Sequence, residues 1–335
     1  MHASPLARIL FAVYVALVAY ASLYPFEGWR AHGLPALAYL SASWPRYVTG
    51  FDVAANLLGY VPYGFLCVVA LHPRLRGLGA LVMAASSALL LSLSLEALQS
   101  YLPARIASNL DVLCNLAGAG AGAAIALAAV PRLIVGGPLR RFRATAFLLG
   151  IEIDLGLVLL ALWLFMQLNP ATLLFAAGDL RDLLSAGEGR ARSAQFFVAI
   201  EAITAAAHLV GVGLLVSALA APGQPARAFF VALVAAAVTV KTAAFAALMR
   251  AESVLAWLTP GARLGLAAGI ALALVAMALP RTARLAAAAV LVAGHNPGLQ
   301  ELIFDLVAPE NENKLFDKVA EKYPTATFAV LELAI

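Results

Sequence analysis

The stretch from Arg76 to Leu98 reads RGLGALVMAASSALLLSLSLEAL, and its only charged residues stand near its two ends. Because roughly 20 apolar residues of helix cross a hydrocarbon core, this stretch predicts a transmembrane helix. The rest of the chain has the same character: 63% of its 335 residues are hydrophobic and 12% are charged. Soluble domains carry about 25% charged residues. The sequence therefore predicts an all-α, polytopic membrane protein.

Similar apolar blocks, separated by proline- and glycine-rich connections, predict about eight transmembrane helices. Their expected ranges are Ala7–Tyr24, Asp52–Leu71, Arg76–Leu98, Asp111–Val130, Ala144–Leu168, Gln195–Leu219, Ala228–Met249 and Ala262–Leu279. They divide the chain into a four-helix region (1–130), a basic loop (131–143), a second four-helix region (144–280) and a tail (281–335). Short, arginine-rich connections are typical of cytoplasmic loops. We therefore expect a multi-pass protein of the cell membrane with both termini in the cytoplasm.

The charges and cysteines exclude several classes of function. The net charge of +4 comes from arginines at the ends of apolar blocks and not from one basic face, so membrane lipids are expected as partners and nucleic acid is not. Cys67 and Cys114 both lie inside apolar blocks and lack the spacing of a disulfide framework or a metal site. We expect no metal and no cofactor.

Three acidic–amide pairs stand out in the first region, each with a spacing of three or four residues that places both members on one helix face. In the predicted topology all three pairs lie near the outer surface, where Arg105 adds a positive charge. We therefore predict an outer ligand-binding site made of Asp52, Asn56, Glu96, Gln99, Arg105, Asp111 and Asn115.

A purely structural interpretation of these residues stays open. Asp52 and Asp111 open their helices and suit N-caps, while Asn56 and Asn115 suit hydrogen bonds between helices. Glu96 is different, because it lies near the C-terminal end of its helix, where the helix dipole disfavours an anion. We expect Arg105 to be its partner. The Gly118 and Gly122 pair is typical of close helix packing.

The same residues carry a family resemblance. The segments NLLGYVPYGFL (Asn56–Leu66) and SLEALQ (Ser94–Gln99), followed by Arg105 and DVLCNLAGA (Asp111–Ala119), resemble the VanZ-like family over about residues 10–130. The resemblance implies a bacterial inner-membrane protein of the cell envelope. The name-giving member is tied to resistance to the glycopeptide teicoplanin, so the implied ligand is a lipid-linked or glycopeptide envelope molecule.

Three functions remain open for this chain. The first is a binding or protective protein that uses the outer site and has no enzymatic activity. The second is an enzyme acting on a lipid-linked substrate, with Glu96 or Asp111 as the acid or base. The third is a transporter that uses Glu201 and Lys241, which are expected at similar depth in the second region and suit an ion pair.

The tail has a different character. Its predicted order is strand, turn, helix and strand, and residues 288–335 resemble the C-terminal part of SixA-type histidine phosphatases, with His295 in the place of a catalytic histidine. The Arg-His-Gly motif that carries the nucleophile in that family is absent from the chain. We therefore expect a cytoplasmic α/β-like remnant, left by truncation, gene fusion or a frame change, without phosphatase activity.

Overall fold

The computed structural model describes residues 4–31, 33, 35–45, 47–134, 137–169, 194–248, 254–280 and 283–284. The described part is mainly α-helical and contains no β-strand, only one isolated β-bridge. Six of its helices are long and apolar enough to cross a membrane, which supports a multi-pass membrane protein. The chain divides into two compact units, unit 1 (Met1–Thr145 with Leu149–Val158) and unit 2 (Ala146–Leu148 with Leu159–Ile335).

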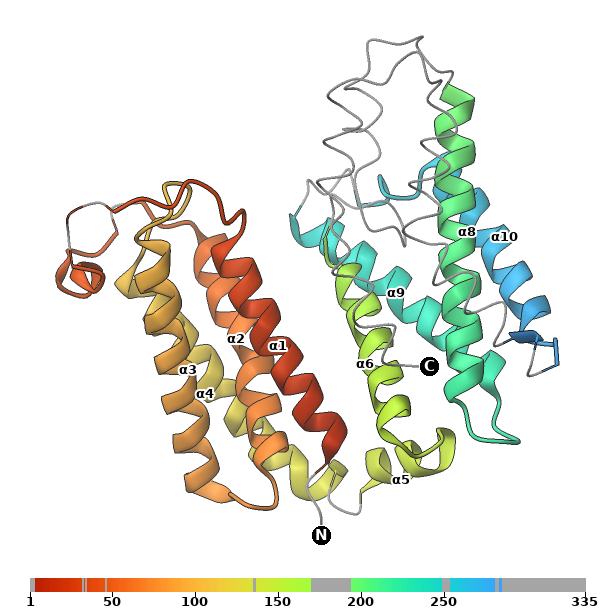
Figure 1. Cartoon of the computed structure of the whole chain (residues 1–335), viewed down its shortest axis with the longest axis horizontal. Coiled ribbons are helices and arrows are strands. Elements are labelled where there is room, and N and C mark those ends of the chain that lie inside the picture. Colours follow the sequence, from red (N-terminus) through yellow and green to blue (C-terminus); the bar gives the residue numbers. More distant parts are fainter. Residues whose placement is uncertain are drawn as a thin grey trace. The chain divides into compact units, whose positions relative to one another are not determined.

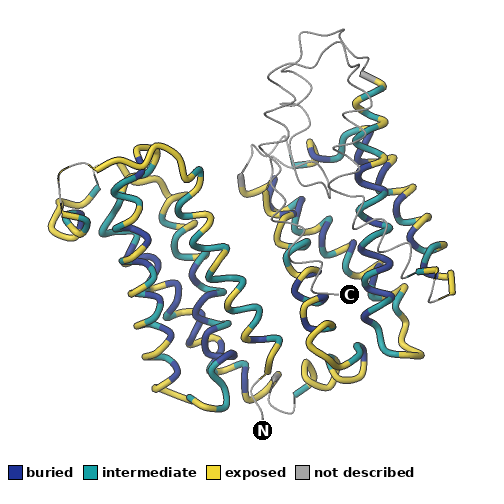
Figure 2. The backbone as a smooth tube through the Cα atoms, viewed as in Figure 1, coloured by how far each residue is buried: buried dark blue, intermediate teal, exposed yellow. Residues whose placement is uncertain are grey.

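Unit 1 is built on four helices that alternate in direction (Figure 1). They are α1 (Pro5–Leu23), α2 (Gly50–Leu71), α3 (Gly77–Gln99) and α4 (Asn109–Ala129). Their bounds agree with the first four predicted ranges to within two residues. A 3-10 turn, η1 (Ala38–Ser41), lies between α1 and α2, and a π turn, η2 (Val130–Ile134), follows α4. Buried positions line the inward faces of the helices (Figure 2).

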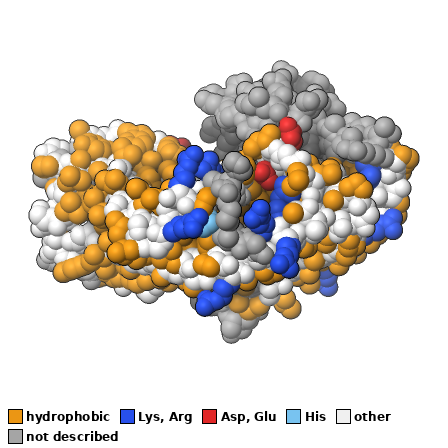
Figure 3. All heavy atoms as spheres, turned by 90° about the horizontal axis from the view of Figure 1, so that it is seen from below, with side chains coloured by type: hydrophobic (Ala, Val, Ile, Leu, Met, Phe, Trp, Pro, Cys, Tyr) orange, Lys and Arg blue, Asp and Glu red, His pale blue; other side chains and the backbone are white. Residues whose placement is uncertain are grey.

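The outward faces of these helices are apolar. Figure 3 shows hydrophobic side chains over much of the molecular surface in that view. Such surfaces are too apolar for contact with water and suit contact with lipid. At least half of the side chain is exposed at Leu58, Leu78, Leu90, Leu113 and Ile125.

Helices α2 and α4 make the closest contact in unit 1, and glycines make it possible. A Cβ atom at Gly118 would collide with the backbone carbonyl of Leu57, and one at Gly122 would collide with that of Val61. Gly64 on α2 faces the Ala119 carbonyl in the same way. The prediction that Gly118 and Gly122 serve helix packing is therefore confirmed.

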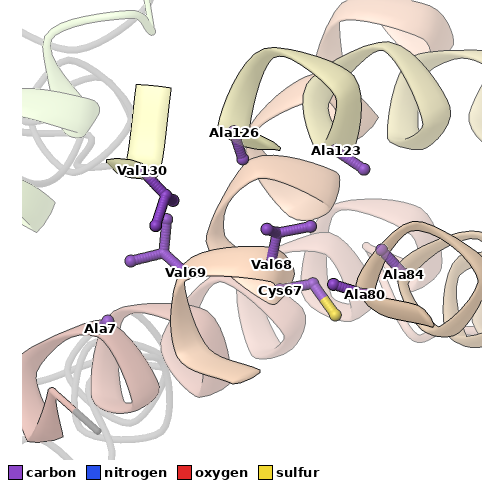
Figure 4. Packing of buried hydrophobic residues seen from close by; sticks show 9 residues of the cluster. All are labelled: Ala7, Cys67, Val68, Val69, Ala80, Ala84, Ala123, Ala126 and Val130. Carbon is purple, nitrogen blue, oxygen red and sulfur yellow. The ribbon is translucent and has the colours of Figure 1, made fainter. Parts of the chain in front are cut away.

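An apolar cluster fills the end of unit 1 where α2 and α4 finish. All four helices contribute to it, and Cys67 is one of its members. Cys67 and Cys114 are both buried free thiols, as expected for apolar packing residues. This packing leaves the polar side chains to the opposite end of the bundle. Figure 4 shows the members of the cluster: Ala7, Cys67, Val68, Val69, Ala80, Ala84, Ala123, Ala126 and Val130.

The prediction of one helix over Ala144–Leu168 is wrong. The structure has a short helix, α5 (Pro138–Ala146), a break, and a second helix, α6 (Ile151–Met166). In the break Phe147 forms an antiparallel bridge with Ala220, and the Leu148 N–H donates to the Leu219 carbonyl at 3.0 Å. Gly150 follows with a φ of 144°, which only glycine adopts readily.

Unit 2 contains α8 (Ala194–Leu219), α9 (Ala226–Leu248) and α10 (Pro260–Ala276). Helix α10 packs closely on α8 through Gly261, Gly265 and Gly269, whose Cβ positions α8 occupies. With 17 and 16 residues, α10 and α6 are shorter than the six candidate spans, so the predicted count of eight transmembrane helices is not confirmed. The predicted α/β-like tail and His295 lie outside the described residues.

Candidate functional site

The polar end of unit 1 is the end at which α1 and α3 finish and α2 and α4 begin. All seven residues of the predicted ligand site belong to the segments that form it. Three helices, α2, α3 and α4, therefore bring polar residues to one end of the bundle. The contacts of the individual side chains then separate those that build the fold from those that remain available to a ligand.

Glu96 is the most deeply placed carboxyl group of this end, with only 4% of the residue exposed. Its Oε2 atom accepts a hydrogen bond of 2.8 Å from the backbone N–H of Ser108. Ser108 is the N-cap of α4, and its hydroxyl accepts from the N–H groups of Leu110 and Asp111. The carboxyl group therefore lies at the positive end of the α4 dipole, which stabilises an anion there.

Arg105 does not pair with Glu96, and that expectation is wrong. Its guanidinium donates to the carbonyls of Ala21 and Tyr24 at 2.9 and 3.0 Å. These carbonyls belong to the C-terminal end of α1, whose last carbonyls have no partner within the helix. Gln99 acts in the same place, because its Nε2 donates to the Ser22 carbonyl at 2.8 Å. Both side chains hold the end of α1.

Asp52 is also structural. It forms a capping box with Thr49: the Thr49 hydroxyl donates to the Asp52 carboxylate at 2.7 Å, and the Asp52 N–H donates to that hydroxyl at 3.1 Å. The side chain is exposed at the start of α2. Its partners account for it as a helix cap, which was the alternative interpretation of this residue.

Asp111 is the acidic neighbour of Glu96 at this end. Its half-buried carboxyl group interacts with the side chains of Asn56 and Ser108, and the charges of Asp111 and Glu96 repel each other. Within the described residues, neither carboxylate forms an ion pair with a lysine or an arginine. The polar end therefore holds two neighbouring acidic groups that are not ion-paired within the described part of the chain.

A second polar layer lies about one helical turn deeper. The Asn115 Nδ2 donates to the Ser92 hydroxyl at 2.9 Å, and Tyr60 interacts with the same hydroxyl, so α2, α3 and α4 each contribute one group. Asn115 is 4% exposed, and its Oδ1 atom has no hydrogen-bond partner among the described residues. A buried acceptor without a donor costs about 1–3 kcal/mol.

Sequence reasoning missed four contributors: Tyr39, Tyr60, Ser92 and Ser108. Ser92 precedes Glu96 by four residues and so shares its helix face, a signal that was present in the sequence. Tyr39 lies in η1, where no periodic pattern marks it; its hydroxyl donates to the Leu93 carbonyl at 3.2 Å. Burial, and secondarily the negative charge of Glu96, raises the pKa of Tyr39. The η1 turn therefore packs beside Glu96.

Comparison with known proteins finds a family match for the part of the chain that forms this end. The family model described as VanZ/LLP1 matches residues 9–131, which include most of α1, all of α2 to α4 and the polar end. These residues form a VanZ-like domain. No curated protein and no solved structure matches the chain, and the resemblance of the tail to histidine phosphatases finds no support in these comparisons.

The charged residues of unit 2, beyond the VanZ-like domain, have their own partners. Glu201 accepts a hydrogen bond of 2.6 Å from the Thr259 hydroxyl, which also caps α10. Lys241 is fully buried, donates to the Asn169 carbonyl at 2.7 Å and lies 5.7 Å from the centre of the Phe245 ring. No ion pair joins Glu201 to Lys241 in the described part of the chain, so the predicted pair is not formed.

Proposed function

We propose that the VanZ-like domain binds the head group of a cell-envelope molecule at its polar end, through hydroxyl or ammonium groups of that molecule. The observation that carries this proposal is the pair of neighbouring carboxyl groups, Glu96 and Asp111, neither of which forms an ion pair with any residue that the structure describes. Ionised carboxylates only accept hydrogen bonds. A ligand rich in donors, such as a sugar or an ammonium group, therefore suits the pair.

The second polar layer supports the same class of ligand. The Oδ1 atom of Asn115 is another acceptor, so the layer beneath the two carboxyl groups also favours a donor. Arg105 was predicted to be part of the ligand site, but its guanidinium is occupied by backbone carbonyls. The proposed site is accordingly reduced to Asn56, Glu96, Asp111 and Asn115, which suit an uncharged or cationic ligand.

The distribution of arginines in unit 1 supports an outward-facing site. The end opposite the polar end carries Arg8, Arg74, Arg76 and Arg132. Positively charged residues accumulate on the cytoplasmic side of membrane proteins. We therefore place the polar end at the outer surface of the bacterial cytoplasmic membrane, where a lipid-linked envelope molecule and a teicoplanin-type glycopeptide are both accessible. Protection against such a drug is the proposed role.

The test is antibiotic susceptibility in a host that expresses the chain. Wild type, Glu96→Gln and Asp111→Asn are compared at matched membrane levels, with Asp52→Asn as the control because Asp52 is an exposed helix cap. We expect wild type and the control to protect against drugs that bind envelope precursors, and the other two variants to lose protection. Protection that survives both Glu96→Gln and Asp111→Asn contradicts the proposal.

An enzyme that uses Glu96 and Asp111 as acid and base is the second candidate, and one observation favours it. The two carboxyl groups differ in burial, which is how paired carboxyl groups come to play different roles in proton transfer. Incubation of the purified chain with envelope lipid extracts distinguishes the two functions: an enzyme converts a lipid, whereas a binding protein retains it unchanged. For the transporter, Glu201 and Lys241 offer no shared site.

A further inference from the structure

Helix α5 combines exposed arginines with exposed apolar side chains. It has nine residues, PLRRFRATA, and Arg140 and Arg141 are exposed. Leu139 and Phe142 are 53% and 50% exposed. Because residues three apart lie on the same face of a helix, Leu139 and Phe142 share one face, and the two arginines between them point away from it.

The third arginine of α5 has a different task. Arg143 forms an ion pair of 2.7 Å with Asp154, in the first turn of α6, and both side chains are largely buried. This pair fixes α5 to the start of the next helix. The guanidinium groups of Arg140 and Arg141 make no such pair within the described residues, so the anchored helix presents them outward.

The place of α5 in the chain puts it at the membrane surface. It follows α4, a candidate membrane span, after the η2 turn, at the end of unit 1 that carries the arginines. Exposed Arg132 and Leu133 in η2 continue the same combination of side chains. Short helices with one apolar face and one basic face lie in the interface, with the apolar face at the acyl boundary.

We infer that α5 lies along the membrane surface and binds the phosphate of an anionic phospholipid. Leu139 and Phe142 enter the acyl boundary, while Arg140 and Arg141 donate hydrogen bonds to phosphate oxygens. A phospholipid matches this helix better than a dissolved anion does. Its phosphate complements the arginines, and its acyl chains cover the neighbouring apolar side chains, which a dissolved anion cannot cover. This site is independent of the one proposed at the polar end.

The test measures the affinity of the detergent-solubilised full chain for phosphatidylglycerol, with phosphatidylcholine as the uncharged reference, by native mass spectrometry. Each arginine near an anionic surface contributes a factor of about five, so Arg140→Gln/Arg141→Gln is expected to bind phosphatidylglycerol about thirtyfold more weakly. Arg140→Lys/Arg141→Lys keeps both charges and most of the binding. If the double variant does not fold, Arg140→Gln and Arg141→Gln are tested singly. Each is expected to bind phosphatidylglycerol about fivefold more weakly.

The matched control is Arg8→Gln/Arg74→Gln, which removes the same charge from exposed positions at the same end of unit 1. We expect this control to bind phosphatidylglycerol nearly as well as wild type. If this control and Arg140→Gln/Arg141→Gln lose the same affinity for phosphatidylglycerol, the effect depends only on total charge. That result overturns the site on α5. Displacement of the lipid by dissolved glycerol 3-phosphate also overturns the proposal, because it shows a site for free phosphate esters.

Discussion

The Glu96 carboxylate on α3 accepts the backbone N–H of Ser108, the residue that caps α4. One hydrogen bond thus joins the end of one membrane helix to the beginning of the next, across the nine-residue connection 100–108. The bond also explains why Glu96 is tolerated near the C-terminal end of α3, where the dipole of that helix disfavours an anion. The neighbouring helix supplies the compensation, so Glu96 has a structural partner as well as a proposed ligand.

This bond gives the first prediction. Glu96→Gln keeps an acceptor for the Ser108 N–H, whereas Glu96→Leu leaves that donor without one. We expect the leucine variant to be less stable than the glutamine variant by about 1–3 kcal/mol. Denaturant unfolding in detergent, followed by tryptophan fluorescence, measures the difference. Identical unfolding midpoints for the two variants show that the Ser108 bond contributes nothing.

The contact between α2 and α4 gives the second prediction. Gly118→Ala pushes a methyl group into the Leu57 carbonyl, so the helices have to separate, at a cost of about 1–3 kcal/mol in unfolding free energy. Gly120→Ala is the control on the same helix, because its Cβ position is open. That control is expected to be neutral or slightly stabilising. Equal thermal stability of the two variants excludes the close contact.

The deeper polar layer gives the third prediction. A double-mutant cycle of Ser92→Ala and Asn115→Ala isolates the hydrogen bond between these side chains. We expect a coupling free energy of about 0.5–1.5 kcal/mol, the range found for hydrogen bonds between membrane helices. The four proteins are compared by unfolding in the same detergent. Strict additivity of the two single effects contradicts the bond.

Gly150 gives the fourth prediction. Its φ of 144° is strained for any residue with a side chain, so Gly150→Ala is expected to destabilise the break between α5 and α6 by more than about 1 kcal/mol. Gly211→Ala, at an open position inside α8, is the control and is expected to have little effect. Hydrogen exchange of the backbone around Phe147 reads out the break directly. Unchanged exchange in the Gly150 variant rules out the strain.

The residues that sequence analysis placed correctly are those whose pattern is local. Apolar length fixed the first four helices, and the spacing of Gly118 and Gly122 identified a packing surface, since both depend only on the geometry of one helix. The partners of Arg105 are backbone carbonyls, and carbonyls occur at every position, so no sequence pattern distinguishes the end of α1 as their location. The prediction that Arg105 pairs with Glu96 rested only on their opposite charges.

The error in the fifth helix has a different origin. The apolar composition runs through the break, and hydropathy therefore treats both sides as one block. The boundary signals were present: Gly150 precedes Glu152 and Asp154, acidic residues typical of a first helical turn. Both acids fall inside the predicted range Ala144–Leu168, which ignored these signals. The strand-like pairing of Phe147 with Ala220 joins distant residues and was not readable from either segment alone.

The glycine contact between α2 and α4 has a mechanical consequence. Two helices whose backbones touch leave no gap for an acyl chain and move as one stiff body. The proposed ligand therefore has no lateral route to Asp111 or Asn115 between α2 and α4 at these glycines.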